Sequence, residues 1–86
     1  MLNLIYTSVF LKEYNSLEVS LQEEVSEKIT LFCSKNNHKT LKVHKLHGAL
    51  KDRYSFSVNY KIRIVFRYLS SNEVALLDLG DHDLYK

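Results

Sequence analysis

The side chains best suited to acid–base chemistry in this 86-residue chain lie in two short segments, 43–48 and 80–85. The first segment contains His44, and the second contains His82 and Tyr85. A histidine gains or loses a proton near neutral pH, so it can act as a general acid or a general base. The two segments therefore hold candidate groups for a proton-transfer reaction.

A fixed positive charge stands between these segments. Arg63 lies among apolar neighbours, in Ile62-Arg63-Ile64-Val65, where an unpaired buried charge would be costly. Such an arginine is either paired with a carboxylate, for example that of Asp78, or held for an anionic ligand. The sequence leaves both alternatives open.

Together these residues meet the demands of RNA cleavage by the RNA's own 2′-hydroxyl. His82 would transfer protons, Arg63 would offset the charge on phosphorus, and Tyr54 or Tyr85 would stack on a displaced base. The alternative is structural, with His82 closing the last strand and Tyr85 packing on the core. Residue types alone favour this structural alternative.

Other chemistries fit this sequence less well. The histidines and the acids at positions 81 and 83 match no zinc-ligand spacing, so we expect no metal and no other cofactor. Cys33 lies on an apolar helical stripe and is expected to be a buried structural residue rather than a nucleophile. As the only cysteine, it excludes an internal disulfide, which favours a reducing cytoplasm.

The net charge of +2 conceals a strong segregation of charge along the chain. Residues 35–69 carry nine lysines and arginines against Asp52 alone, a net of +8, while residues 1–34 and 70–86 each carry −3. A basic block of this kind indicates a polyanionic partner such as nucleic acid. The alternative is a solvated, lysine-rich surface without a partner.

Length and composition predict one soluble domain over residues 1–86. Apolar residues make up 45% and charged residues 26% of the chain, as in ordinary globular proteins. No apolar run is long enough to span a bilayer, and the N-terminus lacks a signal-peptide pattern. We therefore expect a cytoplasmic protein without a membrane partner.

Periodicity predicts the elements that must position these groups. Residues 2–6 alternate as a first strand, and Thr7 or Ser8 can cap a short helix. A second helix is predicted by helical spacing, with a capping box at Asn15 and Glu18 or at Ser20 and Glu23. Its apolar stripe consists of Leu17, Leu21, Val25, Ile29, Phe32 and Cys33.

From residue 53 onward the period changes to two. Strands are predicted over 54–58, 61–67 and 74–79, with a tight hairpin at Asn59 and Tyr60 and an apolar, central last strand. The prediction is an α+β fold in which an antiparallel helical pair covers one face of a four-stranded sheet, formed by the first strand and a three-stranded meander. Lys61, Arg63 and Arg67 would project from the other face.

Segments 43–48, 60–66 and 79–85, together with this order of elements, resemble the RelE/ParE superfamily of bacterial toxins. The resemblance covers nearly the whole chain. It implies a RelE-like fold and the toxin role in a type II toxin–antitoxin module. The RelE and YafQ branches are ribosome-dependent endoribonucleases that cut mRNA, whereas the ParE branch inhibits DNA gyrase.

The resemblance also implies roles for individual residues. His82 matches the histidine of a terminal Gly-x-His motif and would be the general acid or base, and Arg63 matches the transition-state arginine of the RelE branch. His44 matches a YafQ-branch histidine, and Tyr85 lies near a C-terminal aromatic residue used for stacking or proton transfer. The segment Tyr54-Ser55-Phe56-Ser57 departs from the family, because it lacks the paired lysines of RelE and the mid-strand histidine of YafQ.

The resemblance therefore implies a metal-independent endoribonuclease that binds the ribosome, its mRNA and a cognate antitoxin. Five residues would hold the RNA backbone: Lys42, Lys45, Lys51, Arg53 and Arg67. Two alternatives are a gyrase inhibitor without nuclease activity and a decayed toxin that only binds its antitoxin.

Overall fold

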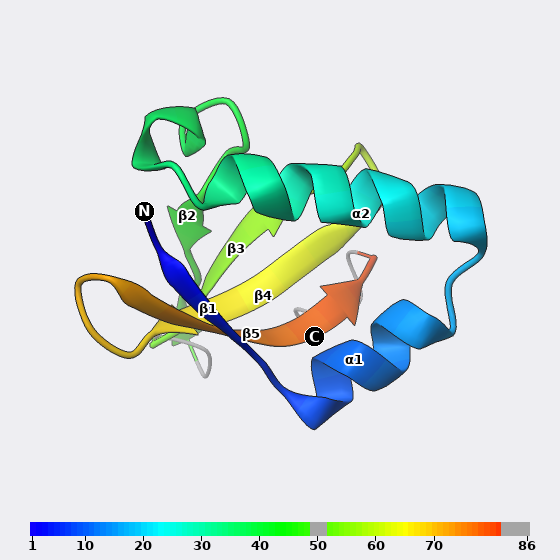
Figure 1. Ribbon diagram of the computed structural model, residues 1–86. Helices are drawn as coiled ribbons and strands as arrows, with labels where there is room; N and C mark the ends of the chain where they lie inside the picture. The colour runs from blue at the N-terminus through cyan, green and yellow to red at the C-terminus, as the bar shows by residue number, and fades with distance from the viewer. Residues whose placement is uncertain (49–51, 82–86) are drawn as a thin grey trace.

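The computed structural model describes residues 1–48 and 52–81, whose strands form one sheet in the order β1-β5-β4-β3-β2 (Figure 1). The strands are β1 (Asn3–Tyr6), β2 (His44–Lys45), β3 (Tyr54–Ser57), β4 (Arg63–Tyr68) and β5 (Glu73–Gly80). β1 pairs with β5 in parallel, and the other neighbours are antiparallel. Helices α1 (Ser8–Asn15) and α2 (Val19–Phe32) are followed by a single 3₁₀ turn, η1 (Lys35–Asn37).

The α+β prediction is confirmed, but the predicted number of strands is wrong. The described residues form five strands rather than four, because His44 and Lys45 pair with Ser55 and Tyr54 to make β2. A two-residue strand is too short to show an alternating pattern in the sequence. The prediction that the last strand is central is confirmed, since β5 lies between β1 and β4.

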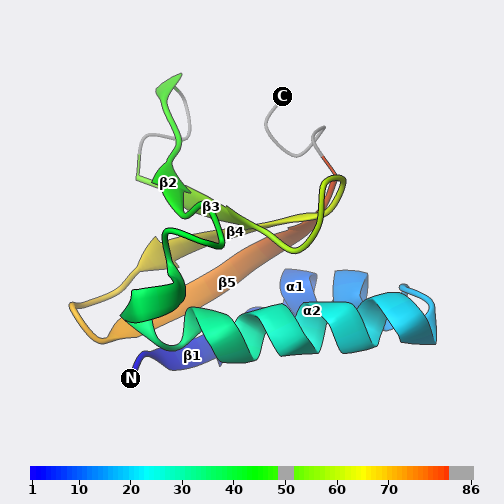
Figure 2. The same cartoon turned by 90° about the horizontal axis from the view of Figure 1, so that it is seen from above.

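Both helices lie on the same face of the sheet (Figure 2). Helix α2 buries Val25, Ile29 and Phe32, the middle and end of the predicted stripe. The ring of Phe32 stacks on Phe56 of β3 with 4.3 Å between ring centroids. These contacts fix α2 across the strands that carry the candidate site.

The predicted cap of α1 is confirmed and the predicted capping boxes of α2 are wrong. The hydroxyl of Thr7 accepts the N–H of Phe10 at 3.2 Å and donates to the carbonyl of Leu76 at 2.8 Å. Helix α2 begins instead after Glu18, whose side chain makes no capping hydrogen bond. The Thr7 hydroxyl therefore fastens the start of α1 to β5.

The β3–β4 hairpin is wider than the tight turn that the sequence predicts. Ser57 and Arg63 are the last paired residues, and Val58 donates its N–H to the carbonyl of Ile62 at 2.9 Å. The side-chain oxygen of Asn59 accepts the N–H groups of Lys61 and Ile62 at 2.8 and 2.7 Å. Asn59 thus closes the turn with its side chain, as asparagine commonly does.

Candidate functional site

The candidate site lies on the face of the sheet away from the helices, which we call the far face. Cross-strand partners share a face, and Phe56, Ile64 and Leu79 pack in the core on the helical side. The alternate positions therefore belong to the far face. They form two rows: His44, Ser55, Val65 and Asp78 in one, and Ser57, Arg63 and Gly80 in the next.

His44 is exposed at the β2 end of the first row, and one of its ring nitrogens is already engaged. Its Nδ1 lies 2.8 Å from the backbone carbonyl of Lys42. A carbonyl only accepts hydrogen bonds, so Nδ1 carries the proton. In the neutral ring, Nε2 then has the lone pair, which is the form that a general base requires.

Arg63 is half-buried, and its guanidinium turns toward the hairpin. Its Nη1 donates to the carbonyl of Asn59 at 2.5 Å and to that of Ile62 at 3.2 Å. Within residues 1–48 and 52–81, the one ion pair joins Arg53 to Asp52 at 3.9 Å. Pairing of Arg63 with Asp78, one of the two alternatives, is therefore not observed, and two neutral carbonyls hold the guanidinium.

Asp78 instead approaches another carboxylate at the edge of β5. Glu13 of α1 accepts the N–H of Leu79 at 3.0 Å, which covers the part of β5 beyond the end of β1. Burial raises the pKa of Glu13, the hydrogen bond from Leu79 opposes this rise, and the carboxylate of Asp78 adds to it. Asp78 thus contributes negative charge near the far face without neutralising Arg63.

The predicted RNA-binding residues do not all share the far face. Arg67 is exposed on β4, four positions after Arg63, and therefore lies on the same face as Arg63. Lys45 directly follows His44 on β2 and so points to the other face. Tyr54 also lies on the helical side, where its ring packs against Phe66 and Tyr68 with centroid distances of 5.6 and 5.0 Å.

Three predicted site residues, Lys51, His82 and Tyr85, lie outside the described residues. Gly80, the register partner of Arg63, precedes His82 by two positions in the sequence. From the predicted set, the far face therefore carries His44 on β2 and Arg63 and Arg67 on β4. His82 and Tyr85 keep their predicted roles as predictions.

The described residues hold no group of three or more metal-ligating side chains. Cys33 is half-buried rather than fully buried, and burial raises the pKa of its thiol, which disfavours the nucleophilic thiolate. Neither helix in the described ranges is long and apolar enough to cross a membrane.

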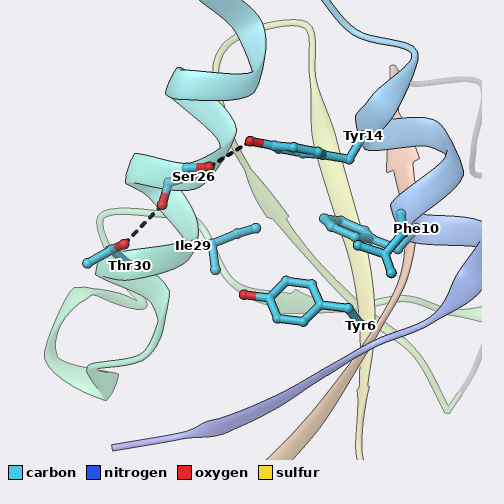
Figure 3. Close-up of a pocket in the computed structure, with 7 residues that line it drawn as sticks. Tyr6, Phe10, Tyr14, Ser26, Ile29 and Thr30 are labelled. Carbon is cyan, nitrogen blue, oxygen red and sulfur yellow. Dashed lines mark hydrogen bonds between the residues drawn. The ribbon is translucent and has the colours of Figure 1, made fainter. Parts of the chain in front are cut away.

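A cavity of about 220 Å³ lies between α1 and α2 (Figure 3). It is lined by side chains without charge, among them Tyr6, Phe10 and Ile29. At one side of it, the hydroxyls of Tyr14 and Ser26 are 2.9 Å apart and join the two helices. This cavity offers packing and hydroxyl groups, but no carboxylate, imidazole or fixed charge.

A second cavity, of about 320 Å³, contains a functional candidate that the sequence did not reveal. It is lined by Lys28 of α2 together with Lys42 and Arg63. Lys28 lies in residues 1–34, which carry a net charge of −3, so the distribution of charge along the sequence does not point to it. Its only sequence signal is its place off the apolar stripe of α2.

Comparisons with known proteins agree with this architecture. No protein-family model matches the sequence, and no curated protein matches it. YafQ from Escherichia coli BL21(DE3) matches with a TM-score of 0.78 and 14% identity, over 98% of this chain and 97% of YafQ. The RelBE2 toxin–antitoxin complex of Mycobacterium tuberculosis gives a TM-score of 0.77 and 15% identity, over 94% of this chain and 98% of the matched chain.

A third solved structure is the YoeB–YefM complex from Staphylococcus aureus. It matches with a TM-score of 0.72 and 17% identity, over 95% of this chain and 98% of the matched chain. The resemblance indicated by residues 43–48, 60–66 and 79–85 is thus confirmed at the level of fold. This chain has the fold of the YafQ, RelE and YoeB toxins.

Proposed function

We propose that this protein is the toxin of a type II toxin–antitoxin module and cleaves mRNA on the translating ribosome. The fold supports the toxin role, because structures with this fold include the RelBE2 and YoeB–YefM toxin–antitoxin complexes. The nuclease role is supported by one observation above all. Arg63 is held by two backbone carbonyls and has no carboxylate partner among the described residues, which suits it to a phosphate.

The proposed reaction is attack of a ribose 2′-hydroxyl on the adjacent phosphorus. A base removes the 2′ proton, the new bond forms a cyclic phosphate, and an acid protonates the leaving 5′ oxygen. His82 is the preferred acid or base, and His44 supports it through its Nε2. Arg63 offsets the charge that builds up on the phosphate, and Tyr85 stacks on a base or transfers a proton.

The far face has room for a phosphate between His44 and Arg63. His44 on β2 and Arg63 on β4 are separated by β3, so strand spacing places their Cα atoms roughly 12 Å apart. A phosphate bound above β3, near Ser57, would lie between the two side chains. Lys42, Arg53 and Arg67, with Lys45 and Lys51, would hold the backbone on either side, so high salt should weaken binding.

A cognate antitoxin is the proposed protein partner. An acidic segment of it would fold over the far face and bury Arg63, which would neutralise the basic block while blocking access to RNA. The protein is proposed to act in the cytoplasm, where translated mRNA is found.

The test is induced expression in bacteria followed by mapping of mRNA 5′ ends. Because the proposed reaction leaves a 5′-hydroxyl, RNA is compared with and without treatment by a polynucleotide kinase before adapter ligation. New 5′-hydroxyl ends within codons, which disappear when translation is blocked, would support the proposal. Replication arrest with intact mRNA would favour a gyrase inhibitor, and unchanged growth would favour a decayed toxin.

A further inference from the structure

The cavity that contains Lys28 lies at the edge of the sheet, beyond the two-residue strand β2. Its walls come from α2, from residues 40–42 and from the β3–β4 hairpin. Leu41 and Val58 form a buried apolar floor, with exposed fractions of 4% and 3%. The backbone bond from Ser57 N to Leu41 O, 2.9 Å long, joins two of these walls.

Three cations line this cavity: Lys28, Lys42 and Arg63. Among the described residues, no carboxylate lies within ion-pair distance of any of them. The neighbouring carboxylate of Glu24 instead accepts a hydrogen bond from the side chain of Asn59. Like charges that share a cavity repel one another, and a bound anion would relieve this repulsion.

Lys42 lines the cavity with its backbone in a strained conformation. Its φ is 59°, in the left-handed region that residues other than glycine seldom adopt. The conformation is held by hydrogen bonds from Lys42 N to Lys39 O and from Val43 N to His38 O, at 3.1 and 2.9 Å. Strain of this kind often accompanies ligand-binding positions.

An aromatic ring stands at the mouth of the same cavity. Tyr60 lines it and is 90% exposed, the largest exposure among the described aromatic residues. Thr40 and Ser57 add hydroxyl donors to the lining. Cations, hydroxyl donors and an exposed ring together match a nucleotide, whose phosphate binds the cations and hydroxyls and whose base stacks on the ring.

We propose that this cavity binds one nucleotide of a single-stranded RNA, with its phosphate on Lys28, Lys42 and Arg63 and its base on Tyr60. The identity of the strand as RNA rests on the proposed function, but binding here requires no cleavage. The cavity adjoins the far face through Lys42, which lines the cavity and whose carbonyl accepts the Nδ1–H of His44. An RNA would thus continue from the far face around the edge of the sheet.

The test measures binding of a short, fluorescein-labelled, single-stranded 2′-O-methyl RNA by fluorescence anisotropy, without ribosomes. This probe lacks the 2′-hydroxyl nucleophile and cannot be cleaved by the proposed reaction. Its binding therefore tests the cavity whether or not the protein is a nuclease. Lys28→Gln/Lys42→Gln is compared with Lys12→Gln/Lys35→Gln, which removes the same charge from exposed lysines that do not line the cavity. Arg63 is left unchanged because it belongs to the proposed active site.

We expect the cavity variant to bind about tenfold more weakly at about 100 mM salt, and its salt slope to fall by about 0.7 for each phosphate that the protein no longer neutralises. Tyr60→Ala should weaken binding at least about fivefold, whereas Tyr60→Phe should bind like wild type. Equal weakening in the two double variants would overturn the proposal, as would unchanged binding by Tyr60→Ala.

A measurement on the wild-type chain guards against misfolding of the variants. Backbone amide chemical shifts are followed by NMR while the same RNA is added. The proposal predicts that the largest changes occur at residues 40–42 and 57–60. If the changes avoid these segments and gather on the α1–α2 cavity of Figure 3 instead, the proposal is wrong.

Discussion

The side-chain amide of Asn59 donates a hydrogen bond to the carboxylate of Glu24, which ties the β3–β4 hairpin to helix α2. The side-chain oxygen of the same asparagine accepts hydrogen bonds from two backbone N–H groups of its own turn. Its backbone carbonyl accepts a hydrogen bond from the guanidinium of Arg63. One residue therefore connects the helical layer, the hairpin and the candidate catalytic arginine.

This connection predicts a measurable coupling between Asn59 and Glu24. Asn59→Ala should lower the free energy of unfolding by about 1–3 kcal/mol, because the turn loses its acceptor. Glu24→Ala should cost less, and the double variant should cost less than the two single changes added together. Urea unfolding of the four proteins measures the coupling, with Glu23→Ala, at an exposed neighbour on α2, as the control. Strictly additive losses would show that the two side chains act independently.

Arg63 provides the most direct test of the proposed chemistry. Arg63→Ala should relieve growth arrest and reduce mRNA cleavage about 10²- to 10³-fold, as expected for loss of a group that stabilises transition-state charge. Arg63→Lys keeps a charge but loses the planar fork, so it should retain partial activity. Thermal unfolding of both variants separates this effect from a loosened hairpin. Full arrest by a folded Arg63→Ala protein would contradict the proposed role.

The hydrogen bond from His44 to the Lys42 carbonyl allows its proposed chemical role to be separated from its structural one. His44→Asn can still donate to that carbonyl through its amide, but it has no basic nitrogen. We expect His44→Asn and His44→Ala to lose a similar factor in cleavage rate, about 10²-fold. The rates are measured on ribosome complexes programmed with a defined mRNA. If His44→Asn cleaves like wild type, the imidazole has only a structural role.

Glu13 predicts how stability changes with pH. Its raised folded-state pKa means that the folded protein binds this proton more tightly than the unfolded chain. The resulting stabilisation is present below the ordinary carboxyl pKa and is lost as the pH rises through the raised value. Glu13→Gln keeps an acceptor for Leu79 N–H without the charge, so it should remove this loss and stabilise the protein at neutral pH by less than about 1 kcal/mol.

The measurement is the unfolding midpoint in urea across the acidic pH range. Glu27→Gln, at an exposed position of α2, serves as the control and should keep the wild-type pH dependence. An unchanged pH dependence in Glu13→Gln would assign the effect to other carboxylates.

Local patterns predict much of this fold. The spacing of Val25, Ile29 and Phe32 fixes the buried side of α2. Alternation in 61–67 and the apolar run 74–79 identify two inner strands of the sheet. Pairings between distant segments leave no such pattern. Neither the parallel register of Asn3 with Glu73 nor the two-residue strand β2 could be predicted from local sequence.

The candidate site shows the same division. The position of Arg63 on the far face follows from alternation, but its carbonyl partners depend on the shape of the hairpin. Tyr54 lies two positions from Phe56 and therefore on the same face of β3, and its ring packs on the core side rather than on the far face. The role of Lys28 could not be predicted from the sequence, because its neighbours in the cavity come from residues 40–42 and from the hairpin, far from it along the chain.

The parallel pairing of β1 with β5 has a consequence for folding during synthesis. Thr7, which caps α1, bonds to Leu76, 69 residues further along the chain. A nascent chain therefore cannot pair its first strand or anchor its first helix until residues 73–76 have left the ribosomal tunnel. Contacts between such distant residues also slow folding. We therefore expect the edge strand β1 to join the sheet last, after the β3–β4 hairpin that carries Arg63 has formed from segments close together in the sequence.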